Sequence, residues 1–161
     1  MSIFKSYYSS PIGTIEIIST EHGISSVLFV KEEAESNSNN HTEECIAQLK
    51  EYFEGERKEF SLTLDMQGSE FQKKIWSELQ SIVFGKTASY IDIAMKLNTP
   101  SASRAIGNAN SKNEILIVLP CHRVIGKSGD LVGYAGELWR KQWLLDHEAR
   151  LCGKATQLSL Y

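Results

Sequence analysis

Residues 103–126, "SRAIGNANSKNEILIVLPCHRVIG", join two unusual segments in one short stretch of chain. The first is a run of small residues that holds a single long cation, Arg104. The second, over residues 114–126, predicts a buried strand in which Pro120 is followed directly by Cys121. A cysteine in this place can be a small buried hydrophobe, because free cysteine is among the most buried residue types. It can also be a nucleophile held rigidly beside polar and cationic groups.

Two short helices are predicted before this strand, over residues 91–97 and 99–107. In the second helix Thr99 stands at the N-cap, Pro100 at the first helical position and Gly107 near the end. Two short helices joined by a tight turn form a helix-turn-helix, a common DNA-docking unit. An ordinary hairpin of two helices is the alternative.

The second helix has an unusual composition for a DNA-reading helix. Residues 101–111, "SASRAIGNANS", are nearly all Ser, Ala, Gly and Asn, with Arg104 as the one long side chain. The minor groove is only about 6 Å wide, so a helix pressed into it needs small side chains. A single long side chain suits insertion into the base stack by a base-flipping protein. Close packing against another helix in the core would also favour small residues, but it does not explain the arginine.

The N-terminal part of the chain reads as a separate α/β unit. β-branched and aromatic residues cut by Gly and Pro predict strands, and apolar residues at helical spacing predict one helix. The expected elements are strands over 2–8, 14–19, 24–30 and 59–65, a loop over 31–40, and a helix over 42–55 from an N-cap at Thr42 to a stop at Gly55. We place the domain boundary at residue 65, with domains 1–65 and 66–161.

Two further helices are expected in the second domain. Ser69 can cap a helix whose apolar stripe consists of Phe71, Ile75, Leu79 and Ile82. A C-terminal helix over 137–151 is expected to turn inward Leu138, Leu145 and either Trp139 or Trp143.

Composition and charge limit the classes of function. The 161 residues are 42% hydrophobic and 23% charged, and no apolar stretch reaches the roughly 18 residues of a membrane span. The first residues lack the pattern of a signal peptide, so we expect a cytoplasmic protein without a membrane partner. Residues 1–65 hold five basic and twelve acidic side chains, whereas 66–161 hold twelve basic and eight acidic ones. This asymmetry favours a polyanion as partner of the C-terminal part, although such differences are common.

Metal sites and disulfides are not expected. The three cysteines, Cys45, Cys121 and Cys152, are odd in number and widely spaced, and none forms a C-x-x-C pair. The adjacent Cys121 and His122 cannot close a four-ligand shell alone.

Several motifs together resemble the O6-alkylguanine-DNA alkyltransferases, the methylated-DNA–protein-cysteine methyltransferase family. They are "PCHRVIG" (120–126), "SYIDIA" (89–94), "SRAIGNAN" (103–110) and "GYAGELWRKQWLLDHE" (133–148), with "LKEYFEGERKEF" (49–60) in the first domain. The resemblance implies an α+β fold with an N-terminal ribonuclease-H-like α/β domain followed by a winged helix-turn-helix domain. It implies cofactor-free direct-reversal repair of duplex DNA that contains O6-alkylguanine, by a monomer that acts once. Activity on O4-methylthymine stays open.

The chemistry of the site fits this resemblance. Displacement at a methyl carbon needs a thiolate, and a cysteine thiol with an ordinary pKa needs a base or a cationic neighbourhood. Successive strand side chains point to opposite faces, so spacing alone does not place His122 on Cys121. The resemblance implies that His122 deprotonates Cys121 through a bound water, that Glu148 orients His122, and that Asn113 bonds the turn behind the site. A solvent-exposed helix charge is the alternative for Glu148.

The resemblance also assigns the groups that hold the DNA and the base. Tyr90 donates to the base and crowds the phosphate of the flipped nucleotide, and Arg104 fills the gap in the stack. The expected DNA contacts are Tyr90, Ser101, Ala102, Ser103, Arg104, Ala105, Gly107 and Arg123. The expected walls of the alkyl and base pocket are Val124, Tyr134, Ala135 and Gly136. A core tyrosine at a helix start is the alternative for Tyr90.

The sequence departs from the family at two positions, where Glu114 and Leu116 replace prolines. These departures put the range of adducts in question, not the transfer itself. Two other classes of protein would place different residues at these positions. A winged-helix regulator with a redox- or alkylation-sensing cysteine would read sequence with long polar side chains, which residues 101–111 lack. A cysteine hydrolase would take its histidine from a distant segment and needs an oxyanion site.

Overall fold

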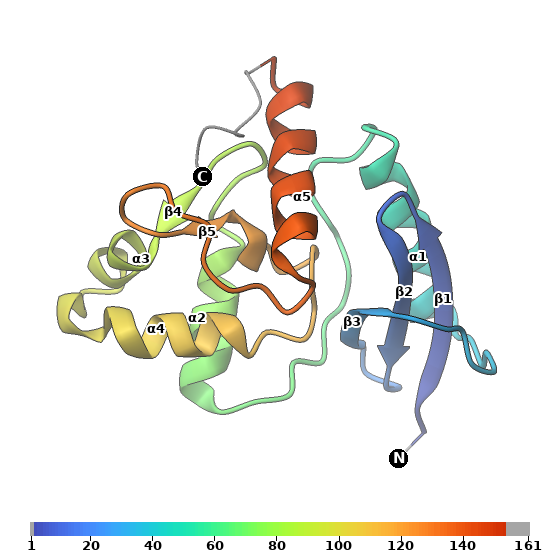
Figure 1. The fold of residues 1–161 in the computed structure, drawn as a ribbon. Helices are drawn as coiled ribbons and strands as arrows, with labels where there is room; N and C mark the ends of the chain where they lie inside the picture. Colours follow the sequence, from blue (N-terminus) through green and yellow to red (C-terminus); the bar gives the residue numbers. More distant parts are fainter. Residues whose placement is uncertain (1, 154–161) are drawn as a thin grey trace. The chain divides into compact units, whose positions relative to one another are not determined.

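The structure, a computed structural model, describes residues 2–153 of the chain and divides it into two compact units between Gln67 and Gly68 (Figure 1). The end of the second predicted domain, residues 154–161, lies outside the described residues. Strands dominate the first unit and helices the second, so the predicted α+β class is confirmed. In residues 2–153 no helix is both long and apolar enough to cross a membrane.

The first unit is an antiparallel sheet of β1 (Phe4–Ser10), β2 (Gly13–Ser19) and β3 (Ile24–Val30), in that order. Helix α1 (Asn40–Phe53) contacts all three strands. Burial alternates along β2, as expected for a sheet with one covered face. The three predicted strands and the helix are thus confirmed.

The start of α1 and the fourth predicted strand need correction. Asn39, not Thr42, caps α1, and Thr42 completes a capping box from the third helical position. Residues 59–65 do not form a strand, and only Leu64 makes a bridge, to Ile24. The cause is Gln48 of α1, whose side-chain amide bonds both the N–H and the carbonyl of Ser61. Because a side chain takes these backbone groups, the pairing of this segment with β3 is limited to the bonds that Ile24 makes with Thr63 and Asp65.

The second unit contains a helix-turn-helix. Helix α3 (Tyr90–Lys96) is followed by one 3₁₀ turn, η1 (Pro100–Ala102), and by α4 (Ser103–Ser111), which packs on α3. The two predicted helices are confirmed, but Thr99 makes no side-chain cap and α4 continues beyond Gly107 to Ser111.

The other elements of this unit are two helices, one 3₁₀ turn and a short parallel pair of strands. They are α2 (Glu70–Leu79), β4 (Ala88–Ser89), η2 (Cys121–Arg123), β5 (Val124–Ile125) and α5 (Leu138–Leu151), with β4 paired to β5. Ser69 caps α2 in a capping box, as predicted for the N-cap.

Some predicted core positions are wrong. Phe71 and Leu138 are 44% and 46% exposed because each lies in the first turn of its helix, at the end of the packed face. Of the two tryptophans considered for the inward face of α5, Trp139 is 53% exposed and Trp143 is half-buried. Trp76 is buried instead, and its indole N–H donates to the carbonyl of Ala109 at 2.8 Å. This bond fixes α2 against α4.

Of the predicted strand over residues 114–126, only Val124–Ile125 is a strand, β5. Residues 115–119 are buried as expected, but they form a turn, with bonds from Val118 N to Leu116 O and from Leu119 N to Ile115 O. Ile117 has a positive φ of 71°, which a strand does not contain. Burial of an aliphatic run therefore did not imply an extended backbone, and Cys121 follows a tight turn rather than a strand end.

Candidate active site

Asn113 builds the turn that holds Cys121. Its Oδ1 accepts from Ile115 N at 2.9 Å, and its Nδ2 donates to the Leu119 carbonyl at 3.1 Å. The same Nδ2 lies 3.1 Å from the Cys121 Sγ, which is 3% exposed at the start of η2. The predicted place of Asn113 behind the turn is therefore observed, and Asn113 also touches the sulfur.

The Cys121 thiol resists ionisation in this resting structure. Burial raises its pKa to about 11, although the Asn113 bond and the positive charge of Lys141 act in the opposite direction. At neutral pH the group is therefore a thiol, and a nucleophilic reaction requires that another group remove its proton.

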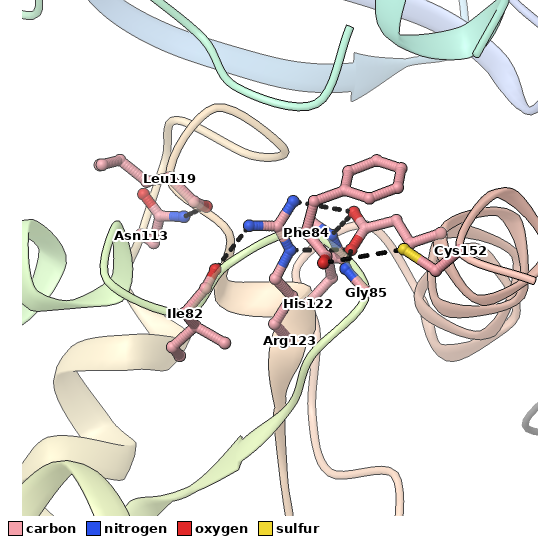
Figure 2. A network of polar contacts seen from close by, with 9 residues as sticks. Ile82, Phe84, Gly85, Asn113, Leu119, His122, Arg123 and Cys152 are labelled. Atoms are coloured by element: carbon pink, nitrogen blue, oxygen red, sulfur yellow. Dashed lines mark hydrogen bonds and ion pairs between the residues drawn. The ribbon is translucent and has the colours of Figure 1, made fainter. Parts of the chain in front are cut away.

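His122 and Glu148 form a buried pair. Figure 2 shows His122 and Arg123 within the polar network around this pair. The His122 Nε2 lies 2.7 Å from Glu148 Oε2. A carboxylate accepts only, so Nε2 carries the ring proton and Nδ1 is the basic nitrogen. Among the described residues, the buried Nδ1 has no hydrogen-bond partner. The ring is thus oriented by Glu148 with a free acceptor on its other side.

Glu148 is held by three groups, so it is not a solvent-exposed helix charge. Besides His122 it accepts from Arg123, at 2.8 and 3.1 Å, and from the Gly85 N–H at 3.2 Å. Burial alone would raise the pKa of Glu148, but His122 and Arg123 together hold this pKa well below its usual range. Burial lowers the pKa of His122 below 6.5, against the pull of Glu148. Glu148 is therefore charged and His122 neutral at neutral pH.

Arg123 does not fit its predicted place among the DNA contacts. Its side chain is buried, with Nη1 2.6 Å from the Ile82 carbonyl and the rest of the guanidinium on Glu148 (Figure 2). All of this pairing lies inside the unit, so the guanidinium is not available to a phosphate. Arg123 is a counter-ion of Glu148.

The residues expected to contact DNA lie mostly on one side of η1 and α4. Ser101, Arg104 and Ala105 are exposed, while Ala102, Ser103 and Gly107 are half-buried. The opposite side of α4, with Ile106, Ala109 and Asn110, is buried. Both explanations for the small residues, close packing in the core and approach to DNA, therefore apply to α4. One face of the helix packs in the core, and another face lies at the surface with Arg104.

The residues expected to line the pocket surround the Cys121 turn only in part. Val124 and Gly136 are buried, whereas Ala135 is exposed. The Tyr134 hydroxyl is buried and has no hydrogen-bond partner among the described residues. Burial, followed by the charges of Cys121 and Glu148, raises the pKa of Tyr134 well above 10. The phenol is therefore a neutral donor near the thiol.

Comparisons with known proteins agree with this geometry. Residues 70–150 match the family described as 6-O-methylguanine DNA methyltransferase, DNA binding domain, and residues 3–66 match its ribonuclease-like domain. The chain belongs to the 6-O-methylguanine DNA methyltransferase family.

Relatives and solved structures support the same family. The methylated-DNA–protein-cysteine methyltransferase of Mycolicibacterium paratuberculosis is 44% identical over 88% of this chain and 89% of its own length. The corresponding protein of Methanosarcina acetivorans is 42% identical over 91% and 98%. The crystal structure of the Mycobacterium tuberculosis O6-methylguanine methyltransferase is 36% identical, with a TM-score of 0.83 over 91% of this chain and 93% of that one. A crystal structure of the Mycobacterium tuberculosis protein in complex with DNA has a TM-score of 0.82, at 36% identity, over 96% of this chain and 98% of that one.

Family membership settles the fold and the class of reaction. The first unit is the ribonuclease-like domain of this methyltransferase family and the second is its DNA-binding domain. The activity is that of a methylated-DNA–protein-cysteine S-methyltransferase, and the process is direct-reversal DNA repair.

Lys141 was not among the site residues expected from the sequence. This lysine is 0% exposed, and its Nζ donates to the carbonyls of Val124 at 2.6 Å and Val132 at 2.8 Å. Burial lowers its pKa to about 8, while the charge of Cys121 raises it. It ties β5 to the loop that leads to Tyr134. The sequence does indicate that Lys141 is buried, because it lies four residues before Leu145 and therefore on the same, buried face of α5.

Metal ligation receives no support from the described side chains. Within residues 2–153, no three His, Cys, Asp or Glu side chains are grouped so that they could hold a metal ion. The three cysteines carry no disulfide, with Cys45 and Cys121 buried and Cys152 exposed.

Proposed function

We propose that Cys121 accepts a methyl or larger alkyl group from the O6 of guanine in duplex DNA, once per protein molecule. A bond forms between Cys121 Sγ and the alkyl carbon as the bond from that carbon to O6 breaks. The thiol proton leaves through His122, and the guanine is released unalkylated after it regains a proton. The thioether product is inert, so the acceptor is not regenerated.

The observation that carries this proposal is the buried His122 ring, which follows Cys121 directly in the chain and is bonded to Glu148. Because Glu148 binds Nε2 at 2.7 Å, the unpartnered Nδ1 is the group able to take the thiol proton, through a bound water. Glu148 then stabilises the imidazolium that forms, as the carboxylate does in a catalytic triad. Asn113 holds the sulfur and favours its anion.

The DNA is proposed to bind along η1 and α4, with the damaged nucleotide flipped out of the stack. Arg104 occupies the gap, and Tyr90 donates to the flipped base. Negative charge develops on guanine as the alkyl group leaves, so a donor aimed at the ring lowers the barrier. The small side chains of this surface then lie in the minor groove: Ser101, Ala102, Ser103, Ala105 and Gly107. Val124, Tyr134, Ala135 and Gly136 wall the pocket.

The protein is proposed to act as a monomer in the cytoplasm. All groups named in the site come from one chain, so a second copy is not needed to complete it. The reaction also requires Cys121 as a free thiol, and the cytosol keeps thiols reduced.

A stoichiometric transfer assay tests the proposal. A duplex oligonucleotide with one O6-methylguanine is mixed with increasing protein, and the repaired strand is counted. We expect one lesion repaired per protein molecule, with no further turnover, and no repair by Cys121→Ser. Binding without repair would support a regulator with a sensing cysteine and would contradict the proposal.

A further inference from the structure

Arg123 donates to both oxygens of the Glu148 carboxylate, and each oxygen also serves a second donor. The Arg123 Nε lies 2.8 Å from Oε1 and its Nη2 lies 3.1 Å from Oε2. The Gly85 N–H donates to Oε1 at 3.2 Å, and the His122 Nε2 lies 2.7 Å from Oε2. The network of Figure 2 thus joins a cation to the proposed base through one shared oxygen.

Further contacts fix the Arg123 guanidinium in this place. Its Nη1 donates to the Ile82 carbonyl at 2.6 Å, and its central carbon lies 5.7 Å from the centre of the Phe84 ring. The side chain is 7% exposed, and a guanidinium keeps its charge in a protein interior. Arg123 is therefore a permanent positive charge with a fixed position beside Glu148.

This charge weakens the attraction of Glu148 for a second proton on the His122 ring. A carboxylate beside a histidine favours the imidazolium form, because opposite charges at short range stabilise each other. A cation bound to the same carboxylate opposes this effect. Burial lowers the pKa of His122, Glu148 raises it, and Arg123 and Lys141 lower it again. The ring is thus oriented by a carboxylate whose charge is already balanced.

We propose that Arg123 is a positioning residue for the transfer, which holds Glu148 in place for His122 and balances its charge, so that Nδ1 stays free to accept the Cys121 proton. The inference rests on the proposed role of His122 as the base. Without the cation, Glu148 would hold an imidazolium in the resting protein. A ring that carries a proton on both nitrogens has no acceptor left for the thiol proton.

The first test is the pH dependence of single-turnover transfer from free O6-methylguanine, so that contacts with DNA do not enter. Arg123→Gln removes the charge but keeps a hydrogen-bond donor. Its rate should begin to fall at a higher pH than that of wild type. The neutral form of a base decreases about tenfold for each pH unit below its pKa. We therefore expect the ratio of the rates at pH 8 and pH 6 to be roughly 3- to 10-fold larger than in wild type.

Two further variants complete this test. Arg123→Lys keeps a positive charge, but an ammonium lacks the planar fork that binds both carboxylate oxygens. Its rate should fall at a pH between those of wild type and Arg123→Gln. If Arg123→Gln does not fold, Arg123→Lys decides, and a wild-type profile shape would overturn the inference. The control is Arg57→Gln, because Arg57 also lies 2.8 Å from a carboxylate, that of Glu51, but in a partly exposed pair of the first unit. Its profile should match wild type.

A titration of His122 by NMR checks the same link without the chemistry. With ¹⁵N-labelled histidine, the four rings of the chain can be assigned by substitution. His122 should gain its proton at a higher pH in Arg123→Gln than in wild type or Arg57→Gln. If this titration is unchanged, Arg123 has a structural role only, and the inference is overturned while the proposed function stands. If the titration shifts but the transfer profile does not, His122 is not the base, and its proposed role fails together with the inference.

Discussion

Glu148 is the residue on which the buried charges of the site depend. It neutralises Arg123, orients His122 and accepts from the Gly85 backbone, all from a side chain that is 1% exposed. Once the carboxylate is removed, Arg123 remains buried as an uncompensated cation. Breaking a buried ion pair in this way costs about 3–5 kcal/mol.

We therefore expect Glu148→Gln to lower the free energy of unfolding by about 3 kcal/mol and to slow methyl transfer as well. Denaturant unfolding and single-turnover kinetics measure the two effects. The control is Glu137→Gln, since Glu137 bridges Arg140 at 3.0 Å but its side chain is 67% exposed. Exposed pairs contribute about 1 kcal/mol or less, so equal losses in the two variants would contradict the buried network.

The pKa shifts predict that the free energy of unfolding decreases both at acid pH and at alkaline pH. The unfolded chain protonates His122 near pH 6.5, whereas the folded chain keeps it neutral, so the free energy of unfolding decreases as pH falls below 6.5. Glu148 extends this loss below pH 4.5, because its folded-state pKa is depressed. Cys121 acts at the other end, since it ionises near 9.0 when unfolded and near 11 when folded, so stability falls across that interval.

Unfolding measured across this pH range checks both decreases. In Cys121→Ser the decrease in the free energy of unfolding at alkaline pH should become smaller, while the decrease at acid pH should stay unchanged. The transfer rate should be level through the neutral range and fall only in more acidic solution, because burial lowers the pKa of His122 in the folded protein and delays the gain of its proton. A rate that instead rose steadily up to pH 9 would show that direct ionisation of the thiol, not His122, limits the reaction.

At the scale of elements, α4 combines one packed face with one exposed face of small residues. Trp76 fixes the packed face through Ala109, and Arg104 projects from the other. We expect Arg104→Ala to slow repair of duplex DNA far more than transfer from the free base, because only the duplex needs the flipped state held open. The ratio of the two single-turnover rates is the measurement. Equal slowing on both substrates would assign Arg104 a structural role.

The elements differ in how far the sequence predicted them. Periodic segments were predicted well, because the pattern of β2 and the cap at Ser69 are set by residues next to one another. The segments 59–65 and 115–119 were mispredicted as strands. Their backbone conformation depends on single side chains elsewhere, Gln48 and Asn113, which take the groups that a neighbouring strand would have used. Apolar alternation carries no information on such long-range bonds.

At the scale of the whole molecule, motifs predicted more of the site than periodicity did. The pairing of His122 with Glu148 joins residues 26 apart and came from the family resemblance, not from spacing. Arg123 and Lys141 are the informative cases: Arg123 was expected to contact DNA and Lys141 was not singled out, yet both are buried. Their role is internal charge balance around Cys121, which a count of net charge does not show.

The absence of a metal requirement is a prediction for the whole protein. The proposed chemistry needs only the thiol, His122 and Glu148, so methyl transfer should survive exhaustive chelation and dialysis. Retained stoichiometry after this treatment is the expected result. Loss of activity that added zinc restores would overturn the proposed mechanism.

The central claim is that Cys121 is the acceptor, and peptide mapping tests it most directly. The protein is reacted with duplex DNA that carries O6-methylguanine, digested and analysed by mass spectrometry. The account predicts one added methyl group, on the peptide that contains Cys121, with Cys45 and Cys152 unmodified. A methyl group on Cys45 or Cys152 while Cys121 stays free would contradict it.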